Sequence, residues 1–469
     1  MMQAGRIRNS SIKVNQRLTR VLTRSFADKR NNMEESRVPT SQFERIYHYG
    51  QLATGLGLGM LTESIKRFGT NDQNGSLLFS KDNLERLVRK LSRMRGAALK
   101  IGQLISFQDE KVVPKEIQEM LAKLQSRANY MPPRQLNRVM STSLGADWQK
   151  KFAKFDQKPF AAASIGQVHR AQVNSNGEIQ DLAVKVQFPG VANSIDSDLN
   201  TLALLLIGSR LLPEGLFLEN TIANARVELK WETDYIREGN FARKYAEALA
   251  QDPYGDKYAV PRVYEELSSP HVLSMEYMRG HHIDRLPSSH DNQDVKNDIA
   301  TRVMRLCLLE ISRFHFMQTD PNWANFLLNT ETNKLEILDF GATRDYGMEF
   351  ITPYLEVLRA AVREDREACE HFSRELGYLT GLESKAMIDA HVDSILILGE
   401  PFRSSTYDFR EQTVTDRVRG NIRLMLRERL TPPPEETYGL HRKLSGAFLL
   451  CARLQAKVPC GDMFREIVG

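Results

Sequence analysis

The chain of 469 residues lacks any run of about 18 or more apolar residues, which an ordinary membrane-spanning helix requires. The nearest approach is YGQLATGLGLGML at 49–61, which is short and rich in glycine. Gly55 and Gly59 form a G-x-x-x-G pair, a spacing that allows two helices to approach closely. We therefore expect this segment to be a packed, flexible stretch or a contact with a membrane or a second copy of the chain.

Cysteine is scarce, and its spacing is typical neither of a disulfide framework nor of a zinc site. The sequence has no C-x-x-C pair and only four cysteines, Cys307, Cys369, Cys451 and Cys460. A disulfide scaffold or a structural zinc site requires regular spacing of such residues. We expect reduced thiols.

Acidic residues are absent from residues 1–27, which carry six basic ones, Arg6, Arg8, Lys13, Arg17, Arg20 and Arg24. These residues contribute a charge of +6, whereas the whole chain has a net charge of +5. The net charge of the remaining residues is therefore about −1, which gives no support for a nucleic-acid partner. An Arg-rich leader with interspersed apolar residues is typical of a mitochondrial transit peptide. RSFA at 24–27 resembles a matrix-protease cleavage site. A disordered basic tail is the alternative.

Hydrophobic periodicity divides the remaining chain into four parts. Residues 28–75 form a linker that contains the glycine-rich segment. Residues 76–158 form a helical extension, because apolar residues recur there at three- and four-residue spacing. Residues 159–278 are expected to be an N-terminal lobe that begins with strands, and residues 279–469 a mostly helical C-terminal lobe.

Several elements of the two lobes are predicted individually. Asn-Ser-Asn-Gly at 174–177 predicts a hairpin whose second strand is LAVKVQF at 182–188. A helix is expected over 221–250, a strand over 271–278, and a short strand entering a loop over 334–341. Strands followed by helices are what a two-lobed α+β fold requires.

Three polar residues have the spacing of a phosphoryl-transfer site. Asp320 precedes Asn325 by five positions, and D-F-G begins at Asp339. This is the spacing of the protein-kinase catalytic loop and its metal-binding D-F-G. Carboxylate and amide oxygens suit Mg²⁺, and a further carboxylate orients or deprotonates the attacking hydroxyl or water. The pattern predicts Asn325 and Asp339 as metal ligands and Asp320 as the catalytic residue.

A lysine and a small-residue loop lie upstream of this site. Lys185 lies in the apolar stretch AVKV, where kinases present a lysine to the α/β-phosphates of ATP. Burying its ammonium is costly unless it meets an anion, although an exposed edge-strand lysine has the same local sequence. Where kinases have a glycine-rich loop, this chain has AAASIGQV at 161–168. The alanine methyl groups should stiffen the loop and limit its approach to phosphates.

A kinase lysine also requires a glutamate on a helix. The helix expected over 221–250 offers four acidic residues, Glu228, Glu232, Asp234 and Glu238. At about 100° per residue, Asp234 and Glu238 share one face, whereas Glu232 points about 120° away from Glu238. One acidic set can therefore meet Lys185 while the other faces a different group.

Four signatures together resemble the UbiB-type atypical kinases, in particular the mitochondrial members that support coenzyme Q biosynthesis. They are KIGQ at 100–103, AAAS at 161–164, ETD at 232–234, and QTDPNWANF at 318–326 followed by DFG. The resemblance covers residues 45–469. It implies an α+β, two-lobed protein-kinase-like fold with an N-terminal helical extension packed over the active site.

The resemblance also implies cofactors and site residues. ATP or ADP and Mg²⁺ are the expected cofactors, with Lys185 paired to Glu238 beside the nucleotide. The extension is expected to bring a regulatory set to the active site, namely Lys100, Gly102 and Gln103 facing Glu232 and Asp234. The nucleotide is expected to lie against Ala161, Ala162, Ala163 and Ser164, and against a hinge formed by Met275, Glu276, Tyr277 and Met278.

The implied function is ATP-driven support of coenzyme Q biosynthesis at the matrix face of the mitochondrial inner membrane. The implied partners are coenzyme Q biosynthetic proteins and inner-membrane lipid or quinone precursors, with a homodimer as one option for assembly. Two departures argue against a protein kinase: Gln318-Thr319 replaces the usual His-Arg before the aspartate, and no A-P-E motif follows D-F-G. A regulatory Ser/Thr protein kinase and a nucleotide-gated scaffold without catalysis remain the alternatives.

Overall fold

The computed structural model describes residues 34–37, 129–209, 218–283 and 292–469, together with positions 44, 47, 50, 51 and 54. Contacts within the chain divide it into two compact units. The β-rich unit takes its described residues from 34–239 and 262–277, and the helical unit takes its own from 240–261 and 278–469. Residues 240–261, which the sequence places in the N-terminal lobe, therefore group with the helical unit.

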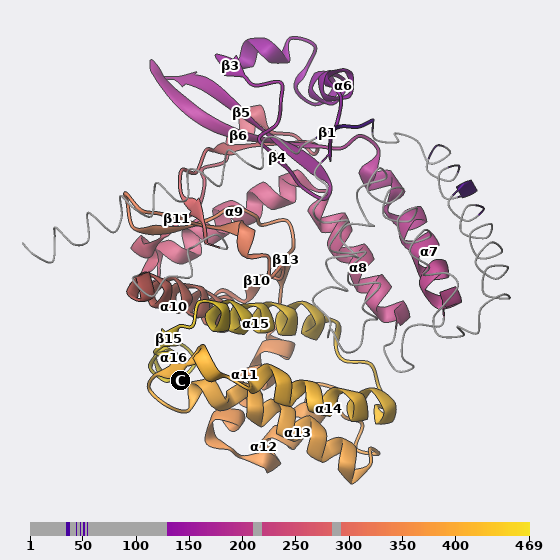
Figure 1. Cartoon of the computed structure of the whole chain (residues 1–469), viewed down its shortest axis with the longest axis vertical. Coiled ribbons are helices and arrows are strands. Elements are labelled where there is room, and N and C mark those ends of the chain that lie inside the picture. Colours follow the sequence, from indigo (N-terminus) through magenta and orange to yellow (C-terminus); the bar gives the residue numbers. More distant parts are fainter. Residues whose placement is uncertain are drawn as a thin grey trace, which may run out of the picture. The chain divides into compact units, whose positions relative to one another are not determined.

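An antiparallel sheet forms the centre of the β-rich unit, in the strand order β3-β5-β6-β8 with β4 also paired to β5. The strands are β3 (Lys154–Phe155), β4 (Ala161–Ala162), β5 (Gly166–Ser175), β6 (Glu178–Gln187) and β8 (Val272–Glu276). Figure 1 shows the long hairpin of β5 and β6. It turns at Asn176 and Gly177, whose φ angles are 54° and 88°. Positive φ at both positions is what an Asn-Gly hairpin turn requires, so the hairpin predicted from sequence is confirmed.

Helices complete the β-rich unit. They are α6 (Pro133–Leu144), α7 (Val191–Ser209), α8 (Leu218–Glu232) and the first turn of α9 (Tyr235–Ala250). Short elements are β1 (Glu34–Glu35), β2 (Asn129–Tyr130) and the 3₁₀ turns Trp148–Lys151 and Glu265–Leu267. One hydrophobic cluster joins these helices to the sheet, with Trp148, Val184, Leu229 and Leu273 among its fully buried members. Burial of these side chains holds the strand that carries Lys185 in place.

The single helix expected over 221–250 is wrong, because the chain breaks between α8 and α9 at Thr233 and Asp234. The Asp234 side chain accepts a hydrogen bond from the backbone N–H of Arg237, 3.0 Å away, and so caps the start of α9. The Tyr235 N–H donates to the Pro270 carbonyl at 3.4 Å instead of continuing α8. The angular comparison of Glu232 with Glu238 along one helix therefore does not apply.

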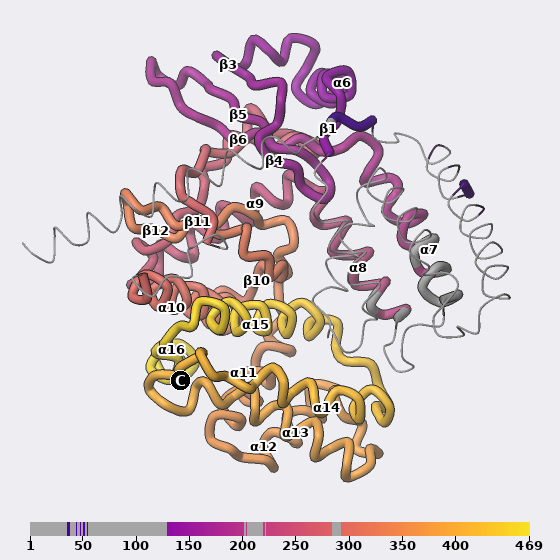
Figure 2. The backbone as a smooth tube through the Cα atoms, in the orientation of Figure 1, coloured from indigo at the N-terminus to yellow at the C-terminus, as the bar shows by residue number. Residues whose placement is uncertain are grey.

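The helical unit contains residues 240–250 of α9 and, among its other described residues, seven further α-helices: α10 (Gln293–Leu309), α11 (Met348–Arg363), α12 (Arg366–Glu375), α13 (Lys385–Gly399), α14 (Val414–Glu428), α15 (Glu435–Arg453) and α16 (Cys460–Ile467). A π-helical turn, Glu310–Phe314, continues α10. Figure 2 follows the backbone of this unit as a tube that ends in yellow at α15 and α16.

Short strands of the helical unit flank the polar residues predicted near 320–340. The sheet order is β7-β12-β11-β9, and β10 pairs separately with β13. The strands are β7 (Tyr258–Ala259), β9 (His281–His282), β10 (Phe316–Gln318), β11 (Phe326–Asn329), β12 (Lys334–Ile337) and β13 (Thr343–Asp345), with β14 (Tyr407–Asp408) and β15 (Lys457–Val458) forming a third pair. Short 3₁₀ turns are Gly255–Lys257, Trp323–Asn325, Glu400–Phe402 and Phe409–Glu411. The strands predicted over 271–278 and 334–341 are present as β8 and β12.

Several predicted segments lie outside the described residues. They are the leader at 1–27, the K-x-G-Q segment at 100–103, and most of the glycine-rich stretch at 49–61. The packing of the helical extension over the active site therefore stays a prediction. Among the residues that the structure does describe, no helix combines the length and hydropathy needed to cross a membrane.

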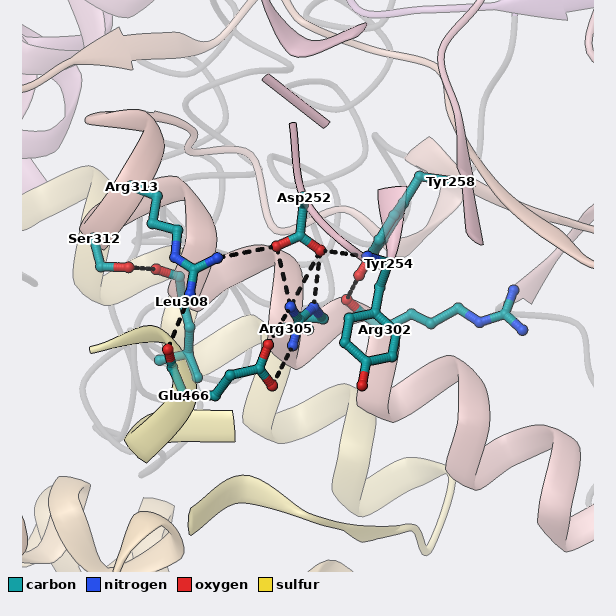
Figure 3. A network of polar contacts seen from close by, with 9 residues as sticks. All are labelled: Asp252, Tyr254, Tyr258, Arg302, Arg305, Leu308, Ser312, Arg313 and Glu466. Carbon is teal, nitrogen blue, oxygen red and sulfur yellow. Dashed lines mark hydrogen bonds and ion pairs between the residues drawn. The ribbon is translucent and has the colours of Figure 1, made fainter. Parts of the chain in front are cut away.

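A buried ion-pair network joins the first and last parts of the helical unit (Figure 3). The Arg305 guanidinium on α10 lies 3.0 Å from Asp252 Oδ2 and 2.8 Å from Glu466 Oε1 on α16. Arg313 reaches the same Asp252 carboxylate at 3.3 Å and the Glu466 backbone carbonyl at 2.9 Å. The Asp252 and Arg305 side chains are 1% and 6% exposed, so these contacts anchor the last helix on α10.

Candidate active site

Lys185 lies on the central strand β6, between Val168 of β5 and Leu273 of β8. Its Nζ atom donates to both carboxylate oxygens of Glu238 at 2.8 Å. The Glu238 side chain is fully buried and that of Lys185 is 14% exposed, so each charge compensates the desolvation of the other. Glu238 lies in the first turn of α9, where the helix dipole favours a carboxylate. The expected pairing of Lys185 with Glu238 is present, and its nucleotide role stays a prediction.

The two acidic residues of the E-x-D signature have different surroundings. Glu232 is the last residue of α8 and is buried, whereas Asp234 caps α9 and is exposed. The carboxylate that receives the Lys185 hydrogen bonds is that of Glu238. Their proposed partner, Lys100, lies outside the described residues, so that pairing stays a prediction.

The alanine loop is a tight turn between β4 and β5. Ala161 pairs with Val168, and the Ala163 N–H donates to the Gly166 carbonyl at 2.8 Å. A Cβ atom at Gly166 would lie 2.6 Å from the Val186 carbonyl oxygen, so only glycine allows this approach to β6. The loop is short, and its pairing with β5 holds it close to the sheet. Its four residues, Ala161, Ala162, Ala163 and Ser164, are all half-buried.

The four residues predicted as a hinge follow one another at the end of β8. Met275 is buried, Glu276 is exposed, and Tyr277 and Met278 are half-buried. The Glu276 N–H donates to the Arg262 carbonyl at 2.8 Å and the Tyr277 N–H to the Asp181 carbonyl at 3.0 Å. These bonds tie Glu276 and Tyr277 to the rest of the β-rich unit, whereas Met278 groups with the helical unit. The contact of this segment with adenine stays a prediction.

Asp320, Asn325 and Asp339 all lie in the helical unit. Asn325 immediately precedes β11 and Asp339 follows β12 by two positions, and Phe326 pairs with Ile337 in the hairpin of those strands. Both side chains therefore leave the same end of the hairpin. The Asn325 Nδ2 atom lies 3.4 Å from Asp320 Oδ2, and this long hydrogen bond brings Asn325 and Asp320 together.

These residues fit a magnesium ion that takes its other ligands from phosphates and water. The amide nitrogen of Asn325 faces Asp320, so its amide oxygen is directed away from that carboxylate. Asp339 Oδ1 accepts the Gly341 N–H at 3.0 Å, which fixes the orientation of the carboxylate. Within the described ranges no three His, Cys, Asp or Glu side chains cluster as a metal cage. One amide and one or two carboxylates are the usual protein share of Mg²⁺ coordination at a nucleotide.

Two buried polar residues, Tyr245 and Glu310, support the residues before Asp320, and neither was among the residues predicted from sequence. The Gln318 N–H lies 2.6 Å from the Tyr245 hydroxyl and 3.2 Å from Glu310 Oε1. The Tyr245 hydroxyl in turn donates to Glu310 at 2.6 Å. Burial raises the pKa of Glu310, and burial beside Glu310 raises that of Tyr245. The only sequence signal is one glutamate inside the apolar stretch LCLLEI.

Comparison with known proteins agrees with this geometry. The family model described as the ABC1 atypical kinase-like domain matches residues 123–373. The chain is 53% identical over 445 residues to a Saccharomyces cerevisiae protein named "Atypical kinase COQ8, mitochondrial", covering 94% of this chain and 87% of that protein. It is 46% identical to a Rattus norvegicus protein named "Atypical kinase COQ8B, mitochondrial", covering 92% and 81%.

One solved structure is similar at the level of the fold. It is the complex of Rv3197 with erythromycin from Mycobacterium tuberculosis, with a TM-score of 0.55 and 24% sequence identity. The match covers 82% of this chain and 96% of that one.

Proposed function

Because the chain belongs to the ABC1 atypical kinase-like family, we propose that it binds ATP with Mg²⁺ and turns ATP over in support of coenzyme Q biosynthesis. The observation that carries the ATP assignment is the buried ion pair of Lys185 with Glu238 on a central strand. A lysine held this way has its ammonium oriented before ligand arrives, which lowers the cost of meeting an anionic phosphate. Kinases use the same pair at the α/β-phosphates.

Each remaining residue takes a part that its surroundings favour. Asn325 and Asp339 would hold Mg²⁺, which supplies charge neutralisation at the phosphates when bound. Asp320, 8% exposed, would orient the attacking hydroxyl or water and accept its proton. The half-buried turn of Ala161 to Ser164 would lie against the nucleotide, and Met275 to Met278 beside adenine.

The acceptor in this proposal is water or a small molecule. Gly341 ends D-F-G, and α11 begins at Met348. Three of the six residues between them form β13 (Thr343–Asp345), which pairs with β10. The long activation segment that protein kinases use as a peptide platform therefore has no counterpart in this described stretch. A hydroxyl acceptor that needs no extended peptide surface fits this arrangement better.

Location and partners follow from the same family. The relatives are named mitochondrial, which supports a mitochondrial location for this chain. The matrix face of the inner membrane is the proposed site of action. Coenzyme Q biosynthetic proteins and lipid or quinone precursors are the proposed partners, with a homodimer as the proposed assembly.

Lys185→Met is expected to weaken binding of Mg-ATP at least about tenfold, because charge-assisted hydrogen bonds contribute about 1.5–3 kcal/mol. Isothermal calorimetry measures the Kd. The matched control is Lys154→Met, since Lys154 lies on the edge strand β3 of the same sheet with 67% of its side chain exposed. Its affinity should stay within about twofold of wild type.

The same two variants test the pathway assignment in cells whose own copy of the gene is deleted. Coenzyme Q content, measured by mass spectrometry, should be restored by Lys154→Met and not by Lys185→Met. Equal restoration by both variants, at equal protein level, would contradict the proposed link between ATP binding and coenzyme Q.

A further inference from the structure

The C-terminal helix α15 contacts the loop that carries Asp320. Arg442 Nε donates to the Thr319 backbone carbonyl at 3.2 Å, across 123 residues of sequence, and its Nη2 lies 3.4 Å from Thr319 Oγ1. That carbonyl belongs to the peptide bond between Thr319 and Asp320. The guanidinium therefore restrains the peptide plane from which the Asp320 side chain projects.

Two glycines allow the helix to lie directly on this loop. A Cβ atom at Gly439 would be 2.6 Å from Thr319 Cγ2, and one at Gly446 would be 2.3 Å from Pro321 Cβ. Both distances are far inside van der Waals contact. The Gly446 carbonyl also accepts a hydrogen bond from the Trp323 indole at 3.1 Å, so α15 meets the loop on both sides of Asp320.

Thr319 connects this contact to the loop that carries Asp339. Its hydroxyl donates to the Ala342 carbonyl at 2.8 Å and its N–H to the same carbonyl at 3.2 Å. Lys443, the residue after Arg442, lies near the group that holds Gln318. Its Nζ atom is 4.0 Å from Glu310 Oε2, and Glu310 Oε1 accepts the Gln318 N–H. Consecutive residues of α15 thus support both positions before the aspartate.

We propose that Arg442 is a positioning residue for Asp320, supplied by α15 in place of the His-Arg pair that precedes the catalytic aspartate in protein kinases. This inference rests on the proposed ATP turnover and deepens it. The chain has the uncharged residues Gln318 and Thr319 at those positions. The guanidinium N–H donors of Arg442 restrain the Thr319–Asp320 peptide from α15, and the two glycines let that helix lie close enough for the contact.

The test compares three variants at the contact with two matched controls. Arg442→Ala should lower kcat for ATP by about 10- to 100-fold with KM for ATP within about threefold, because a displaced catalytic group costs up to about 100-fold in rate. Arg442→Lys should recover part of kcat by donating to the Thr319 carbonyl. Gly446→Ala should lower kcat in the same way.

The controls separate positioning from general destabilisation. Arg403 also donates to backbone carbonyls, those of Ala361 and Leu396, and it does so away from the Asp320 loop. Gly420 lies inside α14 with no atom within 4 Å of an added Cβ. Arg403→Ala and Gly420→Ala should leave kcat within about threefold of wild type. Equal loss of kcat in Arg403→Ala and Arg442→Ala would overturn the proposal.

Hydrogen exchange keeps this test independent of catalysis. Backbone amides of residues 318–325 should exchange faster in Arg442→Ala and Gly446→Ala than in wild type or Arg403→Ala, whether or not ATP turns over. An inactive wild-type protein would refute the proposed turnover alone. Unchanged exchange at 318–325 in Arg442→Ala and Gly446→Ala would overturn the positioning role itself. Should Arg442→Ala fail to fold, Arg442→Lys and Gly446→Ala provide the same readouts.

Discussion

Asp339→Asn is expected to lower kcat for ATP turnover by about 100-fold or more, the scale on which losing one group that stabilises transition-state charge acts. The substitution keeps the size of the side chain and its ability to accept the Gly341 N–H. It removes the negative charge that would attract Mg²⁺ to the end of the β11–β12 hairpin. Steady-state ADP release at saturating Mg²⁺ measures the effect.

The control for this variant is Asp345→Asn on β13. Asp345 is exposed and pairs with Lys244 at 2.5 Å, so its loss should change kcat by less than about threefold. A second readout is the Mg²⁺ concentration that gives half-maximal rate, which should rise in Asp339→Asn alone. Full activity of Asp339→Asn at ordinary Mg²⁺ would remove Asp339 from the metal site.

Arg305→Met is expected to lower the free energy of unfolding of the helical unit by about 3–5 kcal/mol, because it leaves the buried Asp252 carboxylate without its principal partner. Arg305 contacts both carboxylate oxygens of Asp252 and both of Glu466 (Figure 3). Its guanidinium also lies 4.2 Å from the centre of the Tyr254 ring. Urea unfolding followed by circular dichroism measures the loss.

Arg366→Met is the matched control for the buried network. Arg366 makes ion pairs with Asp389 and Asp393, yet 46% of its side chain is exposed. Surface pairs of this kind contribute about 0–1 kcal/mol, so the control should unfold within about 1 kcal/mol of wild type. Equal stability of Arg305→Met and Arg366→Met would mean that the buried network does not anchor α16.

Local chemistry made part of the fold predictable. The Asn-Gly turn requires positive φ at two consecutive positions, so it indicated the β5–β6 hairpin from four residues. Four short signatures indicated the UbiB-type resemblance and the kinase-like fold, and the family match confirms both. The pairing of Lys185 with Glu238 followed from that resemblance.

Other features depend on contacts that no local pattern records. The break between α8 and α9 depends on a cap by Asp234 and a bond from Tyr235 to Pro270, and apolar periodicity continues through it. The contact of Arg442 with Thr319 spans 123 residues, and the spacing of Gly439 and Gly446 resembles that of any helix glycines. Such contacts become visible only when α15 and the Asp320 loop are seen together.

The fate of the γ-phosphate tests the central claim most directly. Purified protein without residues 1–27 is incubated with γ-labelled ATP, Mg²⁺, cardiolipin-containing vesicles, a quinone-precursor mimic and a mixture of Ser/Thr peptides. Our account predicts that the label leaves as inorganic phosphate or on the small molecule, that peptides stay unlabelled, and that Asp339→Asn abolishes the reaction. Labelled peptides, or nucleotide binding with no Asp339-dependent turnover under these conditions, would contradict it in favour of a protein kinase or a nucleotide-gated scaffold respectively.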